Sequence, residues 1–301
     1  MCGIIYAKNL IDNHPVNNLV KILYENQKDR GQQGYGFVGL NAEQIGTYRA
    51  TDEEGIMKYL NGYQYDEIIF HHRLPTSTKN TLKTTHPFVV EIDDKKYYFM
   101  HNGTIQNADK LKEKHLKEGI AYSSIEGEDF NDSEALAWDF CLWLNDKQEK
   151  MEAEGFVAFV CVEIDKKTNR AEKLYFYRND KSQLKIYKDS TLLLLASEGN
   201  YALLEKNWLC FWDYQKRQLC KYRSLDIPSP EIFSFNQYAY SDFDEEEEIE
   251  LDIMALEQER DYLVSVGEYE KAEVIDDEIE GLKDLLKEGK NGEGQPRLDN
   301  F

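Results

Sequence analysis

The feature that most constrains the fold of this chain is a series of short runs rich in β-branched and aromatic residues, distributed over residues 1–240. Such runs, bounded by polar and turn-forming residues, are typical of β-strands. They predict strands at 3–8, 35–40, 66–73, 88–92, 96–103, 155–164, 173–179 and 191–197. Two longer segments predict helices over 15–30 and 132–148, and we expect Asp132 or Ser133 to cap the second. A strand-rich chain with long helices indicates stacked layers.

The bulk properties exclude several classes of protein. A chain of 301 residues with 41% hydrophobic residues can bury a substantial core. The formal net charge of −21 argues against binding to nucleic acid or to anionic membranes. No apolar run reaches the roughly 18 residues of a membrane span, and Lys8, Asn9 and Asp12 lie where a signal peptide is apolar. We therefore expect a cytoplasmic protein with no direct contact with nucleic acid or membrane.

The cysteine pattern leaves one thiol available for chemistry. The five cysteines, at positions 2, 141, 161, 210 and 220, are odd in number and show no CxxC spacing. This argues against a disulfide framework and against a zinc site. His71 and His72 do not supply a metal site either, because neighbouring residues in a strand point to opposite faces. We expect no metal and no cofactor.

The composition changes near residue 241, where an acidic run begins. Beyond it, apolar residues recur at helical spacing on two stripes, separated by the segment SVGEY: Ile249, Ile253, Leu256 and Leu263, then Ala272, Ile275, Ile279, Leu282 and Leu286. This pattern predicts a helical hairpin with one apolar seam. We expect one domain over residues 1–240, an acidic linker and hairpin over 241–290, and a flexible tail over 291–301.

Cys2, directly behind the initiator methionine, is either a small buried residue of the first strand or a nucleophile. Methionine aminopeptidase accepts a small second residue, so removal of Met1 would place a thiol and a free α-amine on Cys2. An α-amine has a pKa of about 7.7–8.0 and can act as a general base at neutral pH. No histidine or aspartate partner is then required.

Three further segments supply groups that complement such a nucleophile. Asn102 and Gly103 end a predicted strand and offer an amide NH2 and a backbone N–H for an oxyanion hole, although Asn-Gly is also a common hairpin turn. Arg73 ends an apolar strand. Its guanidinium can bind a substrate carboxylate through two hydrogen bonds, or it can form a structural salt bridge. Asp132 can cap a helix, hold a substrate ammonium, or do both. Together these groups describe a site for an α-amino acid with an amide side chain, and glutamine fits.

Six motifs in order, MCGI, RGQQGYGF, HHRLPTS, THP, HNGTIQN and NDSEA, resemble those of a class II glutamine amidotransferase domain of the N-terminal nucleophile hydrolase family. The resemblance extends over roughly residues 2–200. It implies an α+β fold, a four-layer αββα sandwich, followed in this chain by the C-terminal helical hairpin.

The resemblance also implies roles for individual residues. It assigns Cys2 as the nucleophile and Asn102 and Gly103 as the oxyanion hole. Arg73 would bind the α-carboxylate of glutamine and Asp132 its α-amine. The remaining matched positions are Arg30 and Gly31 in the loop beside the nucleophile, and Thr76 and His86 in the glutamine pocket. The chain departs from the family at Leu74, where an aromatic residue is frequent, and at Ser77, where a histidine is frequent. These departures predict weaker stacking and hydrogen bonding around glutamine.

The resemblance implies a glutaminase that passes ammonia to an enzyme supplied by another chain, because the residues after 240 are too few for an ammonia-consuming domain. The segment over 249–288 weakly resembles a UVR motif, and we expect it to dock that enzyme or a second copy of this chain. Two alternatives remain open: a self-sufficient amidase for another γ-glutamyl compound, and a binding or assembly module that retains Met1.

Overall fold

The computed structural model of the protein describes residues 2–11, 14–74, 79–125, 127 and 129–229, together with 253, 256, 257, 260, 273–277 and 279–284. The chain divides into two compact units, residues 1–230 and 231–301. The domain boundary expected at residue 240 and the tail expected over 291–301 lie outside the described residues.

Unit 1 contains two antiparallel sheets. The first has seven strands in the order β11, β9, β10, β1, β4, β2, β3. Their bounds are Gly3–Asn9 (β1), Tyr35–Leu40 (β2), Ile45–Ala50 (β3), Glu67–His72 (β4), Lys185–Lys188 (β9), Leu192–Ala196 (β10) and Ala202–Leu203 (β11). The second has six strands in the order β13, β12, β8, β7, β6, β5. Their bounds are Phe88–Ile92 (β5), Lys95–Ile105 (β6), Gly155–Asp165 (β7), Arg170–Arg178 (β8), Trp208–Asp213 (β12) and Gln218–Ser224 (β13).

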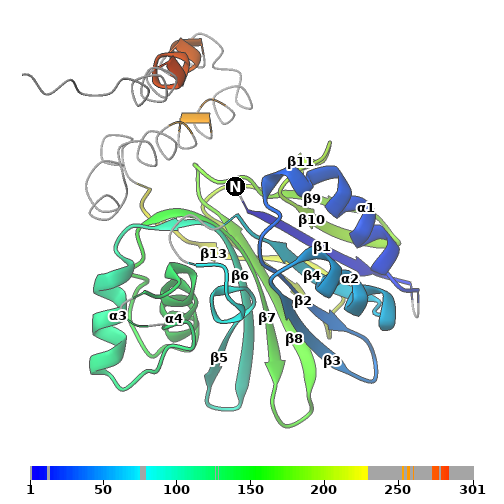
Figure 1. Cartoon of the computed structure of the whole chain (residues 1–301). Helices are drawn as coiled ribbons and strands as arrows, with labels where there is room; N and C mark the ends of the chain where they lie inside the picture. Colours follow the sequence, from blue (N-terminus) through cyan, green and yellow to red (C-terminus); the bar gives the residue numbers. More distant parts are fainter. Residues whose placement is uncertain are drawn as a thin grey trace, which may run out of the picture. The chain divides into compact units, whose positions relative to one another are not determined.

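Helices cover the outer face of each sheet, which completes the four-layer αββα sandwich (Figure 1). Helices α1 (Asn17–Gln27) and α2 (Glu53–Gly62) pack on the first sheet. Helices α3 (Ala108–Lys117) and α4 (Asp132–Leu144) lie on the side of the second sheet, and α4 contacts β5 and β6. Two short 3-10 turns, η1 (Lys28–Arg30) and η2 (Leu82–Thr84), precede β2 and β5. The α+β sandwich predicted from the sequence is confirmed.

The central core lies between the two sheets. Ile4 and Ile69 of the first sheet and Met100 and Val160 of the second belong to one buried apolar cluster. Two further clusters lie between each sheet and its helices. Because the inner strands are covered on both faces, their sequences are apolar without strict alternation. This explains why all eight predicted strands are present, with only small shifts at their ends.

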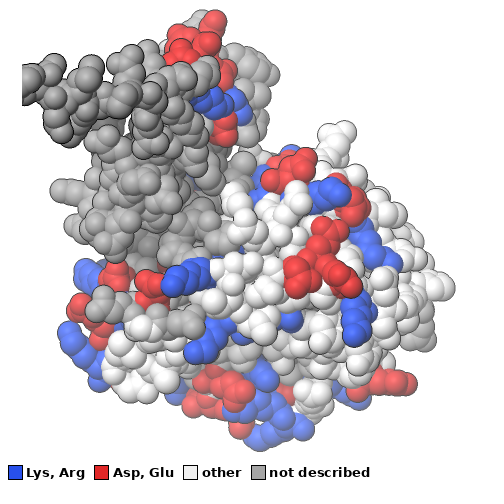
Figure 2. Space-filling model, viewed as in Figure 1, with Lys and Arg blue, Asp and Glu red and all other residues white. Residues whose placement is uncertain are grey.

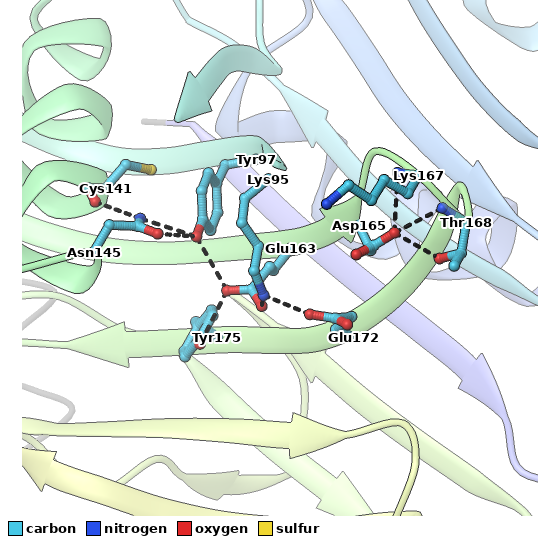
Figure 3. Close-up of polar contacts among 10 residues, drawn as sticks. All are labelled: Lys95, Tyr97, Cys141, Asn145, Glu163, Asp165, Lys167, Thr168, Glu172 and Tyr175. Carbon is cyan, nitrogen blue, oxygen red and sulfur yellow. Dashed lines mark hydrogen bonds and ion pairs between the residues drawn. The ribbon is translucent and has the colours of Figure 1, made fainter. Parts of the chain in front are cut away.

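A buried carboxylate joins three strands of the second sheet (Figure 3). Glu163 on β7 is 3% exposed, and its Oε2 accepts hydrogen bonds from Tyr97 of β6 and Tyr175 of β8, both at 3.2 Å. Lys95 forms ion pairs with Glu163 and with Glu172 of β8. The buried charge is therefore paired and hydrogen-bonded, which a carboxylate in this position requires.

The cap predicted for the helix beginning at residue 132 is wrong by one position. The N-cap of α4 is Asn131, whose side chain accepts a hydrogen bond from the Ser133 N–H at 3.0 Å. Asp132 is the first helical residue and is directed to another partner, described below. Asparagine and aspartate cap helices about equally well, so local sequence did not distinguish them.

In unit 2, the described residues include parts of both predicted helical segments. Ile253 and Ile279 are buried, and ion pairs join Arg260 to Asp276 at 3.2 Å and Lys283 to Glu257 at 2.8 Å. These pairs connect residues of the first segment to residues of the second. The remaining positions of the predicted hairpin lie outside the described residues. None of the helices in the described ranges has both the length and the apolar character needed to cross a membrane.

Charge is distributed unevenly between the two units. Residues 231–301 contain 23 Asp and Glu residues and 6 Lys and Arg residues. Residues 1–230 contain 34 Asp and Glu residues and 30 Lys and Arg residues. Figure 2 shows basic and acidic side chains interspersed over the described surface that faces the viewer. Most of the net negative charge of the chain therefore lies in the C-terminal unit.

Candidate active site

The start of β1 brings Cys2 beside Arg73. In the antiparallel pair of β1 and β4, Gly3 lies opposite His72 in the last pair of the ladder, and Cys2 and Arg73 are the residues that adjoin this pair. Cys2 as a residue is partly exposed, and its thiol donates to the Leu74 carbonyl at 3.7 Å. Burial raises the pKa of this thiol, whereas the Leu74 contact and the charges of Arg73 and Arg30 lower it by less. At neutral pH the thiol is therefore protonated, and attack requires a base.

Two side chains bind the main-chain carbonyl of Cys2. Asn102 Nδ2 donates to it at 3.0 Å and Arg30 Nε at 2.9 Å. Arg30 also forms an ion pair with Glu198, which follows β10. Asn102 belongs to the second sheet and Cys2 directly precedes β1 of the first, so this contact joins the two sheets. Cys2, Arg30 and Asn102, all selected from the sequence, lie together.

Asn102 and Gly103 are within β6 and do not form a hairpin turn. They pair with Ala158 and Val157 of β7. Gly103 has a φ of 129°, and a Cβ at this position would lie 1.9 Å from the Phe156 carbonyl oxygen. Only glycine fits there, and its exposed backbone borders the carbonyl contact of Asn102.

His101 anchors this part of β6 through contacts of its ring with α4 and β7. Its Nδ1 lies 2.9 Å from Ser133 Oγ of α4, and its Nε2 lies 3.1 Å from the Phe156 carbonyl. The ring is 1% exposed. Thus α4 and β7 both hold the residue directly before Asn102.

Arg73 is a buried guanidinium close to both Cys2 and Asp132. It is 4% exposed, and its Nη1 donates to Thr84 Oγ1 at 3.1 Å and to the Lys79 carbonyl at 3.5 Å. Burial lowers the pKa of Arg73, while the charges of Cys2 and Asp132 raise it. A cation at this depth can bind an anion with little competition from water.

Asp132 faces the strand that carries the oxyanion candidates. Its Oδ2 accepts a hydrogen bond from the Ile105 N–H at 2.7 Å, and the residue is partly exposed. This orientation follows from the cap, since Asn131 occupies the capping position and leaves Asp132 for β6. The structure therefore brings Arg73 and Asp132 to the same region as Cys2 and Asn102.

The close approach of two loops explains Gly31. A Cβ on Gly31 would lie 2.5 Å from the carbonyl carbon of Arg73 and from the nitrogen of Leu74. The Gly31 carbonyl also lies 2.8 Å from His72 Nδ1. The loop beside the nucleophile is thus packed directly against the segment that carries Arg73.

The neighbouring histidines of β4 point to opposite faces, as expected. His71 Nε2 lies 3.1 Å from the His101 carbonyl in the second sheet, whereas the His72 ring packs against Tyr24 of α1 at 5.2 Å between centroids. Among the residues that the structure describes, no group of three or more His, Cys, Asp or Glu side chains is arranged to hold a metal ion.

The structure describes only one of the two residues predicted to line the glutamine pocket. Thr76, like Ser77, lies outside the described residues. His86 is 2% exposed and stacks on His71 with ring centroids 3.9 Å apart, and within the described part of the chain neither of its ring nitrogens has a hydrogen-bond partner. A contact between His86 and glutamine stays a prediction.

Sequence reasoning missed Ser197 and Glu198, which directly follow β10. Ser197 Oγ accepts hydrogen bonds from the Ile4 N–H and from Asn102 Nδ2, both at 2.9 Å. Glu198 pairs with Arg30. The signal available in the sequence was two polar residues at the end of an apolar strand, which is too common to identify a site.

The chain is similar to known proteins over part of unit 1. The family model of class II glutamine amidotransferases matches residues 32–205, a range that includes Arg73, Asn102, Gly103 and Asp132. The amidophosphoribosyltransferase of Mus musculus is 30% identical over 136 residues, which are 43% of this chain and 25% of that protein. For the amidophosphoribosyltransferase of Homo sapiens, the identity is 30% over 104 residues, 32% of this chain and 20% of that protein. The matched part is thus a quarter or less of these relatives.

Two solved structures share the fold. A structure described as the allosteric regulatory enzyme of purine biosynthesis has a TM-score of 0.58 at 17% identity, and the match covers 75% of this chain and 50% of the other. The glutamine phosphoribosylpyrophosphate amidotransferase from B. subtilis, complexed with ADP and GMP, has a TM-score of 0.56 at 16% identity, with the same coverage. With a family model that matches more than half of its residues, this chain belongs to the class II glutamine amidotransferases.

Proposed function

We propose that the protein hydrolyses the side-chain amide of glutamine with Cys2 as the nucleophile. The observation that carries this proposal is the hydrogen bond from Asn102 to the Cys2 carbonyl, because it joins the proposed nucleophile to the proposed oxyanion residue. The family membership supports the reaction class.

The reaction proceeds through a thioester. After removal of Met1, the α-amine of Cys2 accepts the thiol proton, and the thiolate attacks the side-chain amide carbon of glutamine. Asn102 Nδ2 and the Gly103 N–H stabilise the negative charge that develops on the amide oxygen. The α-ammonium returns the proton to the leaving nitrogen, ammonia departs, and water releases glutamate from the thioester.

Two charged residues orient the substrate. The Arg73 guanidinium binds the α-carboxylate, and Asp132 binds the α-ammonium. Arg73 lies near both Cys2 and Asp132, which supports these roles. Thr76 and His86 complete the proposed pocket. Arg30 holds the Cys2 carbonyl, and Gly31 lets its loop pack against the segment that carries Arg73.

A separate acceptor enzyme uses the ammonia, and residues 249–288 form its docking element or a contact with a second copy of this chain. The acidic composition of this unit favours a basic partner surface, because complementary charge accelerates encounter and disfavours wrong partners. The proposed compartment is the cytoplasm, which is supported by five cysteines that are all free thiols.

The alternative activity is hydrolysis of another γ-glutamyl compound. Leu74 favours it, since its side chain stands where the family frequently has an aromatic residue. Steady-state kinetics with glutamine and with γ-glutamyl peptides separate the two. The proposal predicts a higher kcat/KM for glutamine, whereas a preference of about 100-fold for the peptides, or about 2.7 kcal/mol of transition-state binding, would favour the alternative.

A non-catalytic module on the same fold is the second alternative. It follows if Met1 is retained, because the Cys2 nitrogen is then an amide and cannot act as a base. The intact mass of the protein from its native host decides this. A mass without Met1 supports the enzyme, and Met1 on essentially every molecule supports the module.

A further inference from the structure

Ser197 links the strand of the proposed nucleophile to the proposed oxyanion residue. Its side-chain Oγ accepts from the Ile4 N–H of β1 and from Asn102 Nδ2 of β6, both at 2.9 Å. Its own main-chain N–H donates to the Ile4 carbonyl at 3.0 Å. The residue is fully buried. One hydroxyl therefore fixes Asn102 relative to the start of β1 across the two sheets.

The hydrogen bonds of Asn102 show how much depends on this contact. Of the two Nδ2 hydrogens, one is donated to the Cys2 carbonyl at 3.0 Å and the other to Ser197 Oγ. Asn102 Oδ1 is buried and has no hydrogen-bond partner among the described residues. The orientation of the amide plane thus rests on the two Nδ2 bonds. Only the bond to Ser197 is directed away from the nucleophile.

The residue that follows Ser197 supports the other donor to the same carbonyl. Glu198 forms an ion pair with Arg30, whose Nε donates to the Cys2 carbonyl at 2.9 Å. The Glu198 N–H in turn donates to Gln27 Oε1 at 3.1 Å. Both side chains that bind the Cys2 carbonyl are therefore held by the Ser197-Glu198 pair.

We propose that Ser197 is a positioning residue for the oxyanion hole: its hydroxyl holds the Asn102 amide so that the hydrogen facing Cys2 can pass from the Cys2 carbonyl to the developing oxyanion. This inference rests on the proposed function of the site. The Ser197 hydroxyl contacts Asn102 and the Ile4 backbone, and neither Arg73 nor Asp132, so its loss lowers kcat and leaves the KM for glutamine nearly unchanged.

The test compares Ser197→Thr with Ser197→Val, which have nearly the same shape and differ in the hydroxyl. Both side chains are branched at Cβ, so the steric cost of enlarging the fully buried Ser197 is similar in the two variants, and they differ in the hydroxyl that accepts from Ile4 and Asn102. In full-length protein with a free N-terminal Cys2, we expect kcat for glutamine to be about 10- to 100-fold lower in the valine variant than in the threonine variant. KM should differ by less than about twofold, and the rate of Cys2 alkylation by iodoacetamide, which needs no oxyanion hole, should be equal. Equal kcat values would overturn the proposal.

A second measurement does not depend on activity. In protein labelled with ¹⁵N-asparagine, the Asn102 side-chain signals are identified by their loss in Asn102→Ala, and we expect their protection from hydrogen exchange in the threonine variant only. If the native protein does not hydrolyse glutamine, the proposed function fails, and these signals still decide the role of Ser197. Equal protection in both variants would show that Ser197 does not hold Asn102.

Discussion

The side-chain amide of Asn102 donates to the main-chain carbonyl of Cys2 across 3.0 Å, although 100 residues separate them in the chain. One residue lies at the start of the first sheet and the other near the end of the longest strand pair of the second. The candidate site therefore exists only when the two sheets are packed face to face. Its chemistry and the stability of the sandwich are coupled.

Loss of the Asn102 amide should lower turnover and spare the nucleophile. Asn102→Ala removes one of two oxyanion donors, which costs roughly 10²–10³ in kcat. Steady-state kinetics measure this, and the rate of Cys2 alkylation serves as the control for an intact nucleophile. Near-normal turnover in this variant would mean that the oxyanion hole lies elsewhere.

Neutralising Asp132 should chiefly weaken substrate binding. In Asp132→Asn the side-chain oxygen can still accept the hydrogen bond from the Ile105 N–H, so the fold is retained while the charge is lost. We expect KM for glutamine to rise about tenfold or more, equivalent to about 1.4 kcal/mol, with a smaller change in kcat. The matched control is Asp109→Asn, on an 83% exposed side chain of α3, which should leave KM unchanged. Equal effects of the two substitutions would remove Asp132 from the ammonium site.

Gly103 should not tolerate a side chain. Alanine at φ 129° adds backbone strain of about 1–3 kcal/mol, and its Cβ would overlap the Phe156 carbonyl oxygen. Gly103→Ala should therefore lower both the free energy of unfolding and kcat. Gly62→Ala is the control, because no atom lies within 4 Å of a Cβ built there. Urea unfolding and kinetics on both variants test this, and a Gly103→Ala protein that behaves like Gly62→Ala would contradict the geometry of β6.

The interior of the sandwich should make the protein sensitive to acid. Burial lowers the pKa of His71, His86 and His101, and lowers those of His72 and His115 to about 4. These rings are neutral in the folded state and bind a proton on unfolding below pH 6.5. Their contribution to stability is therefore present above pH 6.5 and is lost as the pH falls from about 6.5 toward 4.

One variant isolates this effect. His86 packs against His71 and Phe88, so His86→Phe removes a titrating group from an aromatic environment. The fall in the free energy of unfolding between pH 7 and pH 5 should become smaller by up to about 1.4 kcal/mol per pH unit. A slope that is identical in His86→Phe and the native chain would rule out His86 as a source of the acid sensitivity.

Much of the sandwich could be predicted because its inner strands are buried on both faces. Residues 35–40 and 67–72 are buried throughout, and their apolar runs are visible without an alignment. The strand β13 is different: it lies at an edge and most of its residues are exposed, so its sequence has no such run. Helices α2 and α3 were not predicted from the sequence, and they bury only two and three residues.

The site residues also differ in whether the local sequence or a distant contact determines their role. Cys2, Arg73 and Asn102 are recognisable because their chemistry is specific. The choice of Asn131 over Asp132 as cap depends on the Ile105 N–H, which binds Asp132 from another element. Ser197 contacts residues 95 and 193 positions away, and no local pattern encodes contacts of that range.

The C-terminal unit should be dispensable for the fold of the catalytic domain. Because residues 1–230 form a compact unit, a chain ending after residue 242 should melt cooperatively and retain its basal glutaminase activity. Light scattering should show weaker self-association, or a binding assay weaker capture of the acceptor enzyme, relative to the full chain. Loss of the cooperative transition would instead make the hairpin part of the core and end the docking proposal.

Labelling with diazo-oxo-norleucine, a glutamine-like electrophile, tests the central claim most directly. In full-length protein whose intact mass lacks Met1, the account predicts one adduct, mapped to Cys2 by peptide mass spectrometry, with glutamine protecting against it. Glutamine hydrolysis should disappear in proportion to the labelled fraction. An adduct on another residue, no adduct on protein with a free N-terminal Cys2, or continued hydrolysis with Cys2 fully labelled would contradict Cys2 as the nucleophile.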